Sequence, residues 1–210
     1  MLIRIVIVAL AYLLGSIPVS YLIARFAGRM DLRAVGSGNV GATNVYRALG
    51  PGWAVLAFLG DALKGALPVL AALVLFGRDP TASWWTAGAG LLAVLGHLFP
   101  PWLKFRGGKG VATSFGVMLA LSPWAALLAF ALWAALAVTL KISSVASLVA
   151  ALSLPGFVYF LDPSPAVRWL ALILTVLIFV SHHENLGRLI RGEEKAIQRN
   201  QPDGKPEAKL

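Results

Sequence analysis

Long apolar runs occupy most of this sequence, and they restrict the folds that the chain can adopt. A helix that crosses a bilayer needs about 20 largely apolar residues. The chain meets that requirement repeatedly, and glycine or proline inside a run is tolerated when neighbouring helices satisfy the backbone. The sequence therefore predicts an all-α integral membrane protein. The apolar runs are Leu2–Arg25, Trp53–Phe76, Trp84–Leu103, Val111–Leu140, Val145–Leu161 and Val167–Val180.

Composition supports a membrane protein and argues against several other classes. The chain is 59% hydrophobic and 13% charged, whereas a soluble domain is about half apolar and about a quarter charged. The net charge is +9, yet the basic residues lie in short gaps between apolar runs, as positive-inside topology requires. We therefore expect no nucleic-acid partner. The chain has no cysteine, which excludes disulfides and thiol catalysis. We also expect no metal and no cofactor.

The distribution of Lys and Arg predicts the orientation. These residues concentrate in three polar segments, at Lys141 and in the tail, which places all three segments in the cytosol and the N-terminus outside. Segments on one side are separated by an even number of crossings. Val111–Leu140 is therefore expected to form two short crossings hinged at Ser122-Pro123, giving about seven transmembrane helices and a cytosolic C-terminus. A single crossing gives six helices, and a re-entrant Val111–Leu121 gives five or six.

The domain organisation follows from the same pattern. The leading apolar run, Leu2–Arg25, is too long for the apolar core of a signal peptide, so we expect a retained helix. Residues 1–191 are expected to form a single polytopic membrane domain. Residues 192–210 are charged and contain proline, and we expect a flexible cytosolic tail.

The first polar segment, Gly36–Arg47, indicates anion binding. Its Gly-x-Gly-x-x-Gly spacing matches the dinucleotide fingerprint only formally, because that motif needs a βαβ unit around it. Glycine-rich turns expose backbone N–H groups that cradle anions, and arginine binds phosphate through two charge-assisted hydrogen bonds. The alternative is a flexible linker, which does not account for the polar residues Ser37, Asn39, Thr43, Asn44 and Arg47.

The second polar segment, Lys104–Gly110, has the same character. It lacks the spacing of a P-loop, so nucleoside triphosphate binding is not supported. Lys109 is flanked by Gly107, Gly108 and Gly110, and a lysine among glycines can direct its charge at a phosphate. The alternative is a positive-inside anchor, a role that does not require three glycines.

The third polar segment, Ser181–Asn185, begins where an apolar run ends. A metal site on one helix needs histidines four residues apart, a spacing that His182 and His183 do not have. His182 and Asn185 lie three residues apart and share a helical face, which suits a hydrogen-bonding pair, although a solvated helix end is the alternative. Asp61 and Lys64 have the same spacing inside an apolar run, and we expect an internal ion pair.

Together these segments resemble one family, the bacterial membrane glycerol-3-phosphate acyltransferases that use acyl-phosphate as donor (the PlsY family). The resemblance extends from about Gly15 to Arg191. The motifs that carry it are Gly-Ser-Gly-Asn-Val-Gly-Ala-Thr-Asn at 36–44, Gly96-His97-x-x-Pro100 leading into 105–113, His182-x-x-Asn185, and the Asp61–Gly65 stretch.

The resemblance implies transfer of a fatty acyl group from acyl-phosphate to the sn-1 hydroxyl of glycerol-3-phosphate. The products are lysophosphatidic acid and phosphate, in the first step of phospholipid synthesis. It also implies a bacterial cytoplasmic (inner) membrane location, an active site facing the cytosol, and glycerol-3-phosphate, acyl-phosphate and membrane lipid as partners. The H-x-x-x-x-D motif of other glycerolipid acyltransferases is absent, because no aspartate stands five residues after His97, His182 or His183.

We therefore expect Ser37 and Arg47 to hold one phosphate, Lys109 with the amides of Gly107–Gly110 to neutralise the other, and His182 with Asn185 to orient the hydroxyl. No nucleophile–base pair is evident, so direct transfer without an acyl-enzyme is expected. An organic-phosphate transporter is the competing class, but such sites lie at the bilayer midplane between repeated halves, and no repeat is evident. Expected substrate contacts are Gly36, Gly38, Asn39, Thr43, Asn44, His97, Lys104, Gly107, Gly108, Gly110 and Ser147.

Overall fold

A computed structural model describes residues 1–77 and 79–198, and the regular elements in these residues are all helices. Most of them match apolar runs of the sequence. The elements are α1 (Leu2–Gly15), α2 (Val19–Ala27), η1 (Leu32–Ala34), α3 (Ala42–Leu49), α4 (Pro51–Phe76), α5 (Pro80–Leu98), η2 (Pro101–Leu103), α6 (Val111–Leu121), α7 (Pro123–Leu140), α8 (Ser143–Leu161), α9 (Pro165–Ser181) and α10 (His183–Ile190).

Glycine and proline set the ends of the long helix α4. Gly50 has a φ of +91° and Pro51 occupies the first turn, where a missing N–H costs nothing. The helix ends before Gly77, whose φ of +79° lies in the region that favours glycine. The predicted hinge is also observed, because α6 ends at Leu121 and α7 begins at Pro123.

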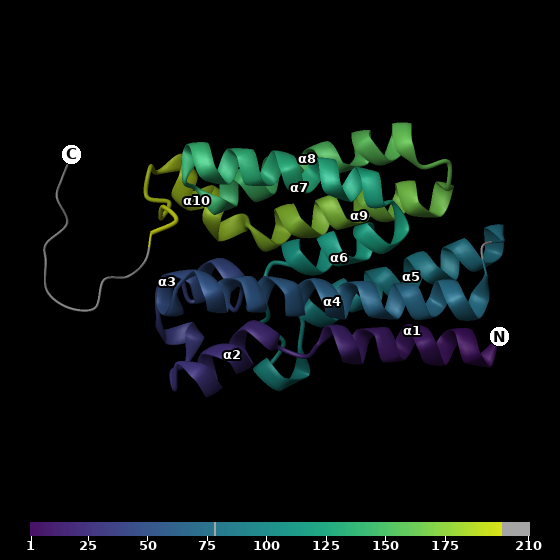
Figure 1. Ribbon diagram of the computed structural model, residues 1–210, viewed down its shortest axis with the longest axis horizontal. Helices are drawn as coiled ribbons and strands as arrows, with labels where there is room; N and C mark the ends of the chain where they lie inside the picture. Colours follow the sequence, from purple (N-terminus) through teal and green to yellow (C-terminus); the bar gives the residue numbers. More distant parts are fainter. Residues whose placement is uncertain (78, 199–210) are drawn as a thin grey trace, which may run out of the picture.

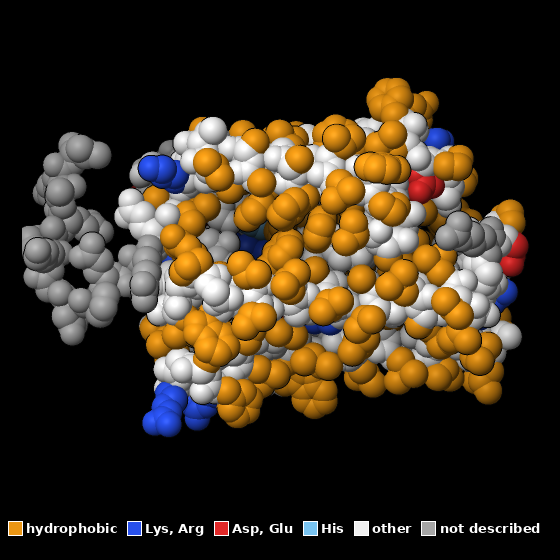
Figure 2. Space-filling model, in the orientation of Figure 1, with side chains coloured by type: hydrophobic (Ala, Val, Ile, Leu, Met, Phe, Trp, Pro, Cys, Tyr) orange, Lys and Arg blue, Asp and Glu red, His pale blue; other side chains and the backbone are white. Residues whose placement is uncertain are grey.

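Five helical segments within the described residues are long and apolar enough to cross a membrane, and there are six if α9 and α10 count as one bent span. The first of them combines α1 and α2 across the break at Ser16–Pro18. The helix α6 is apolar but shorter. Large apolar side chains such as Val74 and Phe160, each 84% exposed, cover the outer faces, and Figure 2 shows such residues over most of the visible surface. The chain is an all-helical integral membrane protein, as predicted.

The helices form two groups, which are joined by α6 (Figure 1) and by the contact of α5 with α9. In one group α1 packs on α4 and α5, and in the other α8 packs on α7 and α9. Between them α6 contacts α4 on one side and α7 on the other. The contact of α6 with α4 is close because any side chain at Gly116 would overlap the backbone of Ala62. The short elements α2, α3 and α10 all lie at the end of the molecule opposite to the N-terminus.

Candidate active site

The three predicted polar segments meet at one cavity of about 670 Å³. Its polar end is lined from α3, α10 and the loops beside them. Its apolar part is lined by α4, α6, α7 and α8, together with Ile178 of α9. The cavity therefore brings cationic groups and a hydrocarbon surface together in one space. The apolar lining residues include Val55, Phe58, Phe115, Met118, Ala126, Ala129, Phe130, Trp133, Ala150, Ala151, Leu154 and Ile178.

Asn44 shapes the loop of the first segment. Its side-chain amide donates to the carbonyls of Leu32 and Val35, each at 3.0 Å, and its oxygen accepts from the Ser37 N–H at 3.0 Å. Asn44 is buried and does not line the cavity, whereas Ser37 does. The predicted contact between Asn44 and substrate is therefore not supported, because all three polar groups of its side chain are used inside the protein.

The glycines of the second segment serve packing rather than anion binding. The Gly107 N–H donates to the Leu98 carbonyl at 3.0 Å, and the Gly108 N–H donates to the His97 carbonyl at 3.2 Å. A side chain at Gly107 or Gly108 would overlap the end of α5 at His97. These two amides are thus not free to cradle a phosphate, contrary to the sequence-based expectation. Gly110, by contrast, does line the cavity.

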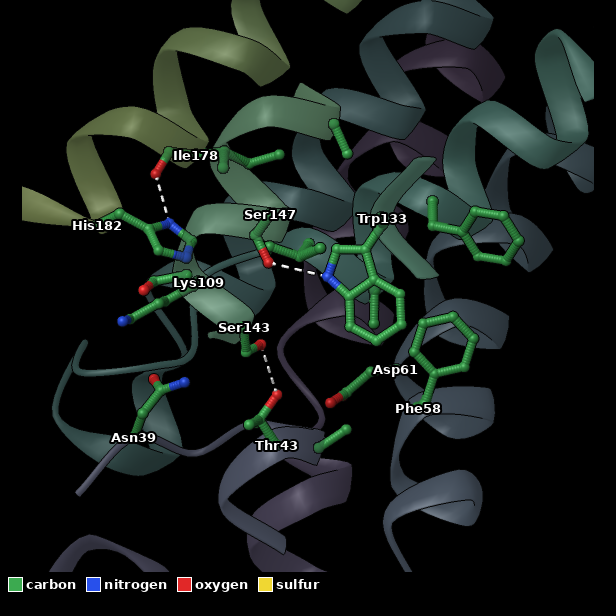
Figure 3. A pocket seen from close by; sticks show the side chains of 18 of the residues that line it. Asn39, Thr43, Phe58, Asp61, Lys109, Trp133, Ser143, Ser147, Ile178 and His182 are labelled. Carbon is green, nitrogen blue, oxygen red and sulfur yellow. Dashed lines mark hydrogen bonds between the residues drawn. The ribbon is translucent and has the colours of Figure 1, made fainter. Parts of the chain in front are cut away.

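Lys109 connects the second segment to the third. Its ammonium group donates to the side-chain oxygen of Asn185, and its carbonyl accepts from the Ser181 hydroxyl at 3.1 Å. His182 is buried, and its Nδ1 lies 2.8 Å from the Ile178 carbonyl. Since a carbonyl only accepts, Nδ1 carries the proton in the neutral ring and Nε2 is an acceptor. Figure 3 shows the His182 ring beside Lys109 at the wall of the cavity.

Glu194, from the predicted tail, completes the polar end. Its carboxylate accepts from Asn185, from the Ser144 hydroxyl at 2.8 Å and from Arg188 at 2.7 Å. Burial opposes its ionisation, yet these three hydrogen bonds outweigh burial and hold the pKa of Glu194 below its usual value. The backbone that follows Glu194 is held in place too, because Arg47 donates to the carbonyls of Lys195 and Ala196, each at 3.2 Å. The predicted tail therefore begins as part of the site, and residues 199–210 lie outside the described residues.

The electrostatics of the polar end centre on Lys109. Burial lowers the pKa of Lys109 to about 8, although the Glu194 carboxylate acts in the opposite direction. Arg47 is only 7% exposed, and its Nε has no hydrogen-bond partner among the described residues. A buried cation without a full set of partners is costly. An anion that binds at the polar end would therefore be stabilised by these cations.

A second polar cluster lies inside the membrane-spanning helices and reaches the cavity through Asp61 and His97, which line it. Asp61 pairs with Lys64 at 2.9 Å and accepts from the Ser20 hydroxyl at 2.7 Å. The Lys64 ammonium also donates to the Ile17 carbonyl at 2.7 Å, and His97 Nδ1 lies 3.6 Å from the Asp61 carboxylate. The predicted internal ion pair is confirmed. Buried charges in this setting must be paired, and this cluster joins α2, α4 and α5.

Hydroxyl groups line the wall between the polar and apolar parts of the cavity. The Thr43 hydroxyl lies 3.0 Å from that of Ser143, and the Trp133 indole N–H donates to Ser147 at 3.2 Å. Figure 3 shows both pairs facing the same space. Within residues 1–77 and 79–198, no group of three or more His, Asp or Glu side chains could hold a metal ion.

Most predicted site residues meet at the cavity. Six do not line it, and among them Lys104 is exposed on the η2 side of the molecule. Sequence analysis missed Ser143, Ser144, Arg188 and Glu194, which line the cavity. The two serines lie close to Lys141 in a polar stretch between apolar runs, and this was the one sequence signal that could have identified them. The predicted residues at the cavity are Ser37, Asn39, Thr43, Arg47, His97, Lys109, Gly110, Ser147, His182 and Asn185, and those away from it are Gly36, Gly38, Asn44, Lys104, Gly107 and Gly108.

Comparison with known proteins decides the family. The family model for glycerol-3-phosphate acyltransferase matches residues 5–192, which is nearly the whole described chain. The chain belongs to the glycerol-3-phosphate acyltransferase family. A glycerol-3-phosphate acyltransferase of Geobacter sulfurreducens is 45% identical over 94% of this chain and 100% of its own length. One of Caulobacter vibrioides is 46% identical over 91% of this chain and 86% of its own.

Solved structures of this acyltransferase family have the same fold. The glycerol 3-phosphate form of PlsY (YgiH) matches with a TM-score of 0.86 and 44% identity, covering 92% of this chain and 94% of that one. The lysophosphatidic acid form of PlsY matches with a TM-score of 0.84, 41% identity and the same coverage. The predicted family and its enzymatic activity, glycerol-3-phosphate acyl transfer to give lysophosphatidic acid, are confirmed.

Proposed function

We propose that this acyltransferase takes its acyl group from acyl-phosphate and transfers it to the sn-1 hydroxyl of glycerol-3-phosphate. The products are 1-acyl-glycerol-3-phosphate and phosphate, and the reaction opens phospholipid synthesis. The observation that carries the proposal is one cavity of about 670 Å³ with a cationic end and an apolar part. Both substrates carry a phosphate and only the donor carries a hydrocarbon chain, so this arrangement suits the pair. Two solved relatives are described as glycerol 3-phosphate and lysophosphatidic acid forms.

The polar end offers two groups of anion-binding residues. Ser37 and Arg47 form the first, from the loop and helix of the first segment, and both line the cavity. Lys109 with Gly110 forms the second, from the loop of the second segment, and both line the cavity. Arginine binds phosphate through a planar fork, whereas lysine acts as a point charge. We assign one phosphate to each group. The assignment to Arg47 is supported by its Nε, which has no hydrogen-bond partner among the described residues.

In the proposed reaction, the glycerol-3-phosphate hydroxyl oxygen attacks the acyl carbonyl carbon. The new ester bond forms as the bond between that carbon and the phosphate oxygen breaks, and the hydroxyl proton passes to the departing phosphate. His182 Nε2, the acceptor of the neutral ring, lies at the cavity wall and orients the hydroxyl together with Asn185. Ser147 and its neighbouring hydroxyls lie between the two parts of the cavity, where the acyl carbonyl would sit.

The donor chemistry explains why no strong base is needed. Acyl-phosphate is already activated, so positioning and preorganised positive charge supply most of the catalysis. Arg47 and Lys109 stabilise the charge that develops on the leaving phosphate. Trapping a covalent acyl group on Ser37 would contradict this direct transfer.

For the membrane arrangement we propose seven crossings, with α6 as the short one, in a bacterial cytoplasmic membrane. The N-terminus then lies outside, and the cavity mouth and C-terminus lie in the cytosol. The proposal is supported by the basic residues of α2, α3 and α10, which lie at the end opposite to the N-terminus (Figure 1), and by the positive-inside rule. Glycerol-3-phosphate would enter from the cytosol, and the acyl chain would remain in the bilayer plane.

The test uses purified protein in lipid, with palmitoyl-phosphate present and glycerol-3-phosphate added or withheld. We expect phosphate release that depends on glycerol-3-phosphate and matches lysophosphatidic acid formation one to one. Acyl-CoA and acyl-carrier protein serve as comparison donors. Activity with either of them but not with palmitoyl-phosphate would refute the proposed donor and keep the acyltransferase.

A further inference from the structure

Residues 194–197 follow α10 and cross the polar end of the cavity, and the mechanism above does not use them. Glu194, Lys195 and Ile197 all line the cavity. We call residues 194–197 the strap. In Figure 1 the strap belongs to the yellow coil beyond α10, at the end of the molecule that also holds α3. It therefore lies beside the first polar segment, although the two are far apart in the sequence.

The strap is held at both ends. At its start, Glu194 accepts from the Ser144 hydroxyl at 2.8 Å and from Arg188 at 2.7 Å. At its far end, the Ile197 N–H donates to the Lys141 carbonyl at 2.7 Å. Lys141 lies in the turn between α7 and α8. The strap thus forms a bridge from α10 to that turn, and its two middle residues are placed over the polar end.

The side chain of Lys195 contacts the turn that carries Ser37. Its ammonium group donates to the Gly36 carbonyl at 2.9 Å. Gly36 has a φ of +60°, which favours glycine, and the next N–H, that of Ser37, donates to Asn44 at 3.0 Å. The turn is therefore fixed by Asn44 from inside the protein and by Lys195 from the strap.

The backbone of the strap holds Arg47. One amino group of this side chain, Nη2, donates to the carbonyls of Lys195 and Ala196, each at 3.2 Å. A guanidinium is planar and rigid, so fixing Nη2 also restricts the direction in which Nε points. Arg47 Nε is buried and has no partner among the described residues. The strap thus occupies one part of the guanidinium and leaves another part for an anion.

We propose that Lys195 is a positioning residue for the phosphate-binding group formed by Ser37 and Arg47. Its ammonium group fixes the turn of Ser37, and its carbonyl fixes Arg47, so one residue sets the placement of both. Such placement matters because a displacement of about 1 Å can lower a rate about 100-fold. The inference rests on the proposed function, which places a phosphate at Ser37 and Arg47. In this role the strap stays closed during turnover.

Substitution of Lys195 tests the role of its ammonium group. Lys195→Met removes that group and keeps the length of the side chain, whereas Lys195→Arg keeps a cationic donor. For Lys195→Met we expect a rise of about threefold to tenfold in KM for one of the two phosphate substrates, the effect of one hydrogen bond. kcat should stay nearly unchanged, and Lys195→Arg should restore most of the loss.

Two comparisons make this test specific. The substrate affected by Lys195→Met should be the one whose KM rises most in Arg47→Ala. Lys104→Met is the matched control, because Lys104 is also exposed but does not line the cavity, and the same charge is lost. Unchanged KM values in Lys195→Met, or a rise for the other substrate, would refute the positioning role.

A disulfide tests whether the strap stays closed. The chain has no cysteine, so Lys141→Cys/Ile197→Cys introduces a single pair at the far end of the strap, where the two backbones are hydrogen-bonded. We expect the oxidised double variant to turn over as fast as its reduced form, with each single variant as a control. Turnover that is lost on oxidation and restored by a reducing agent would show that the strap must open. Failure of the disulfide to form would contradict the contact itself.

The outcomes also separate this inference from the proposed function. If the unmodified enzyme is inactive with palmitoyl-phosphate but active with another long-chain donor, the proposed donor fails. The Lys195 variants are then compared with that other donor, because glycerol-3-phosphate still brings a phosphate to the polar end.

Discussion

Replacing Arg47 with alanine tests the central claim about the polar end. The Arg47 guanidinium is 7% exposed, lines the cavity and has an Nε without a partner among the described residues. Loss of one preorganised donor to a developing charge costs about 2–4 kcal/mol, which is roughly a 30- to 900-fold fall in kcat/KM. We expect that fall in Arg47→Ala, measured as lysophosphatidic acid formation against glycerol-3-phosphate concentration.

The structure adds a second expected effect of the same change. Arg47 donates to the carbonyls of Lys195 and Ala196, and each such hydrogen bond contributes about 0.5–1.5 kcal/mol. Arg47→Ala should therefore also loosen the segment that carries Glu194, seen as faster proteolysis after residue 190. Arg25→Ala is the matched control, because Arg25 is exposed on α2 and away from the cavity. Well-folded Arg47→Ala protein with activity within threefold of the unmodified enzyme would refute the assignment of Arg47 to a phosphate.

Three further predictions concern the surroundings of the site. Because burial lowers the pKa of Lys109 to about 8, its cationic form is lost as pH rises through that value, and kcat/KM should fall about tenfold per pH unit above it. In Lys109→Arg this fall at high pH should be much weaker. An unchanged fall in that variant would show that another group titrates. Gly108→Ala should disturb His97 and the end of α5, since the new methyl group would overlap the His97 ring. Thermal unfolding of this variant should occur at a lower temperature. Gly52→Ala is the unaffected control, because a methyl group added at Gly52 would meet no atom within 4 Å. Asp61→Asn leaves Lys64 buried without its counter-charge, which should lower the free energy of unfolding by about 3–5 kcal/mol. The yield of folded protein should therefore drop more than the turnover per folded molecule. The reverse result would place Asp61 among the catalytic groups.

The sequence was sufficient for the long apolar helices and for the chemical character of the site. Hydropathy located every long helix and the hinge at Ser122-Pro123, because the length and polarity of a membrane helix are local properties. Charge spacing identified the Asp61–Lys64 pair, since residues three apart on a helix are neighbours whatever surrounds them. Polar residues in otherwise apolar surroundings drew attention to Arg47, Lys109 and His182, and all three line the cavity.

Other features depended on contacts between residues far apart in the chain. The sequence suggested amide donors at Gly107 and Gly108, but the turn back onto α5 uses both amides in backbone hydrogen bonds. Glu194 was assigned to a flexible tail because residues 192–210 are charged and contain proline. It contacts Ser144, 50 positions away, and is held there by three hydrogen bonds.

Local sequence thus determined which segments form the long helices and which residue types could handle phosphate. The tertiary structure alone decided which of those residues share one cavity. The physical reason is that helix formation and membrane insertion depend on properties of neighbouring residues in the chain. A site depends instead on the packing of α3, α4, α6, α7, α8 and α10, and no single segment encodes that packing.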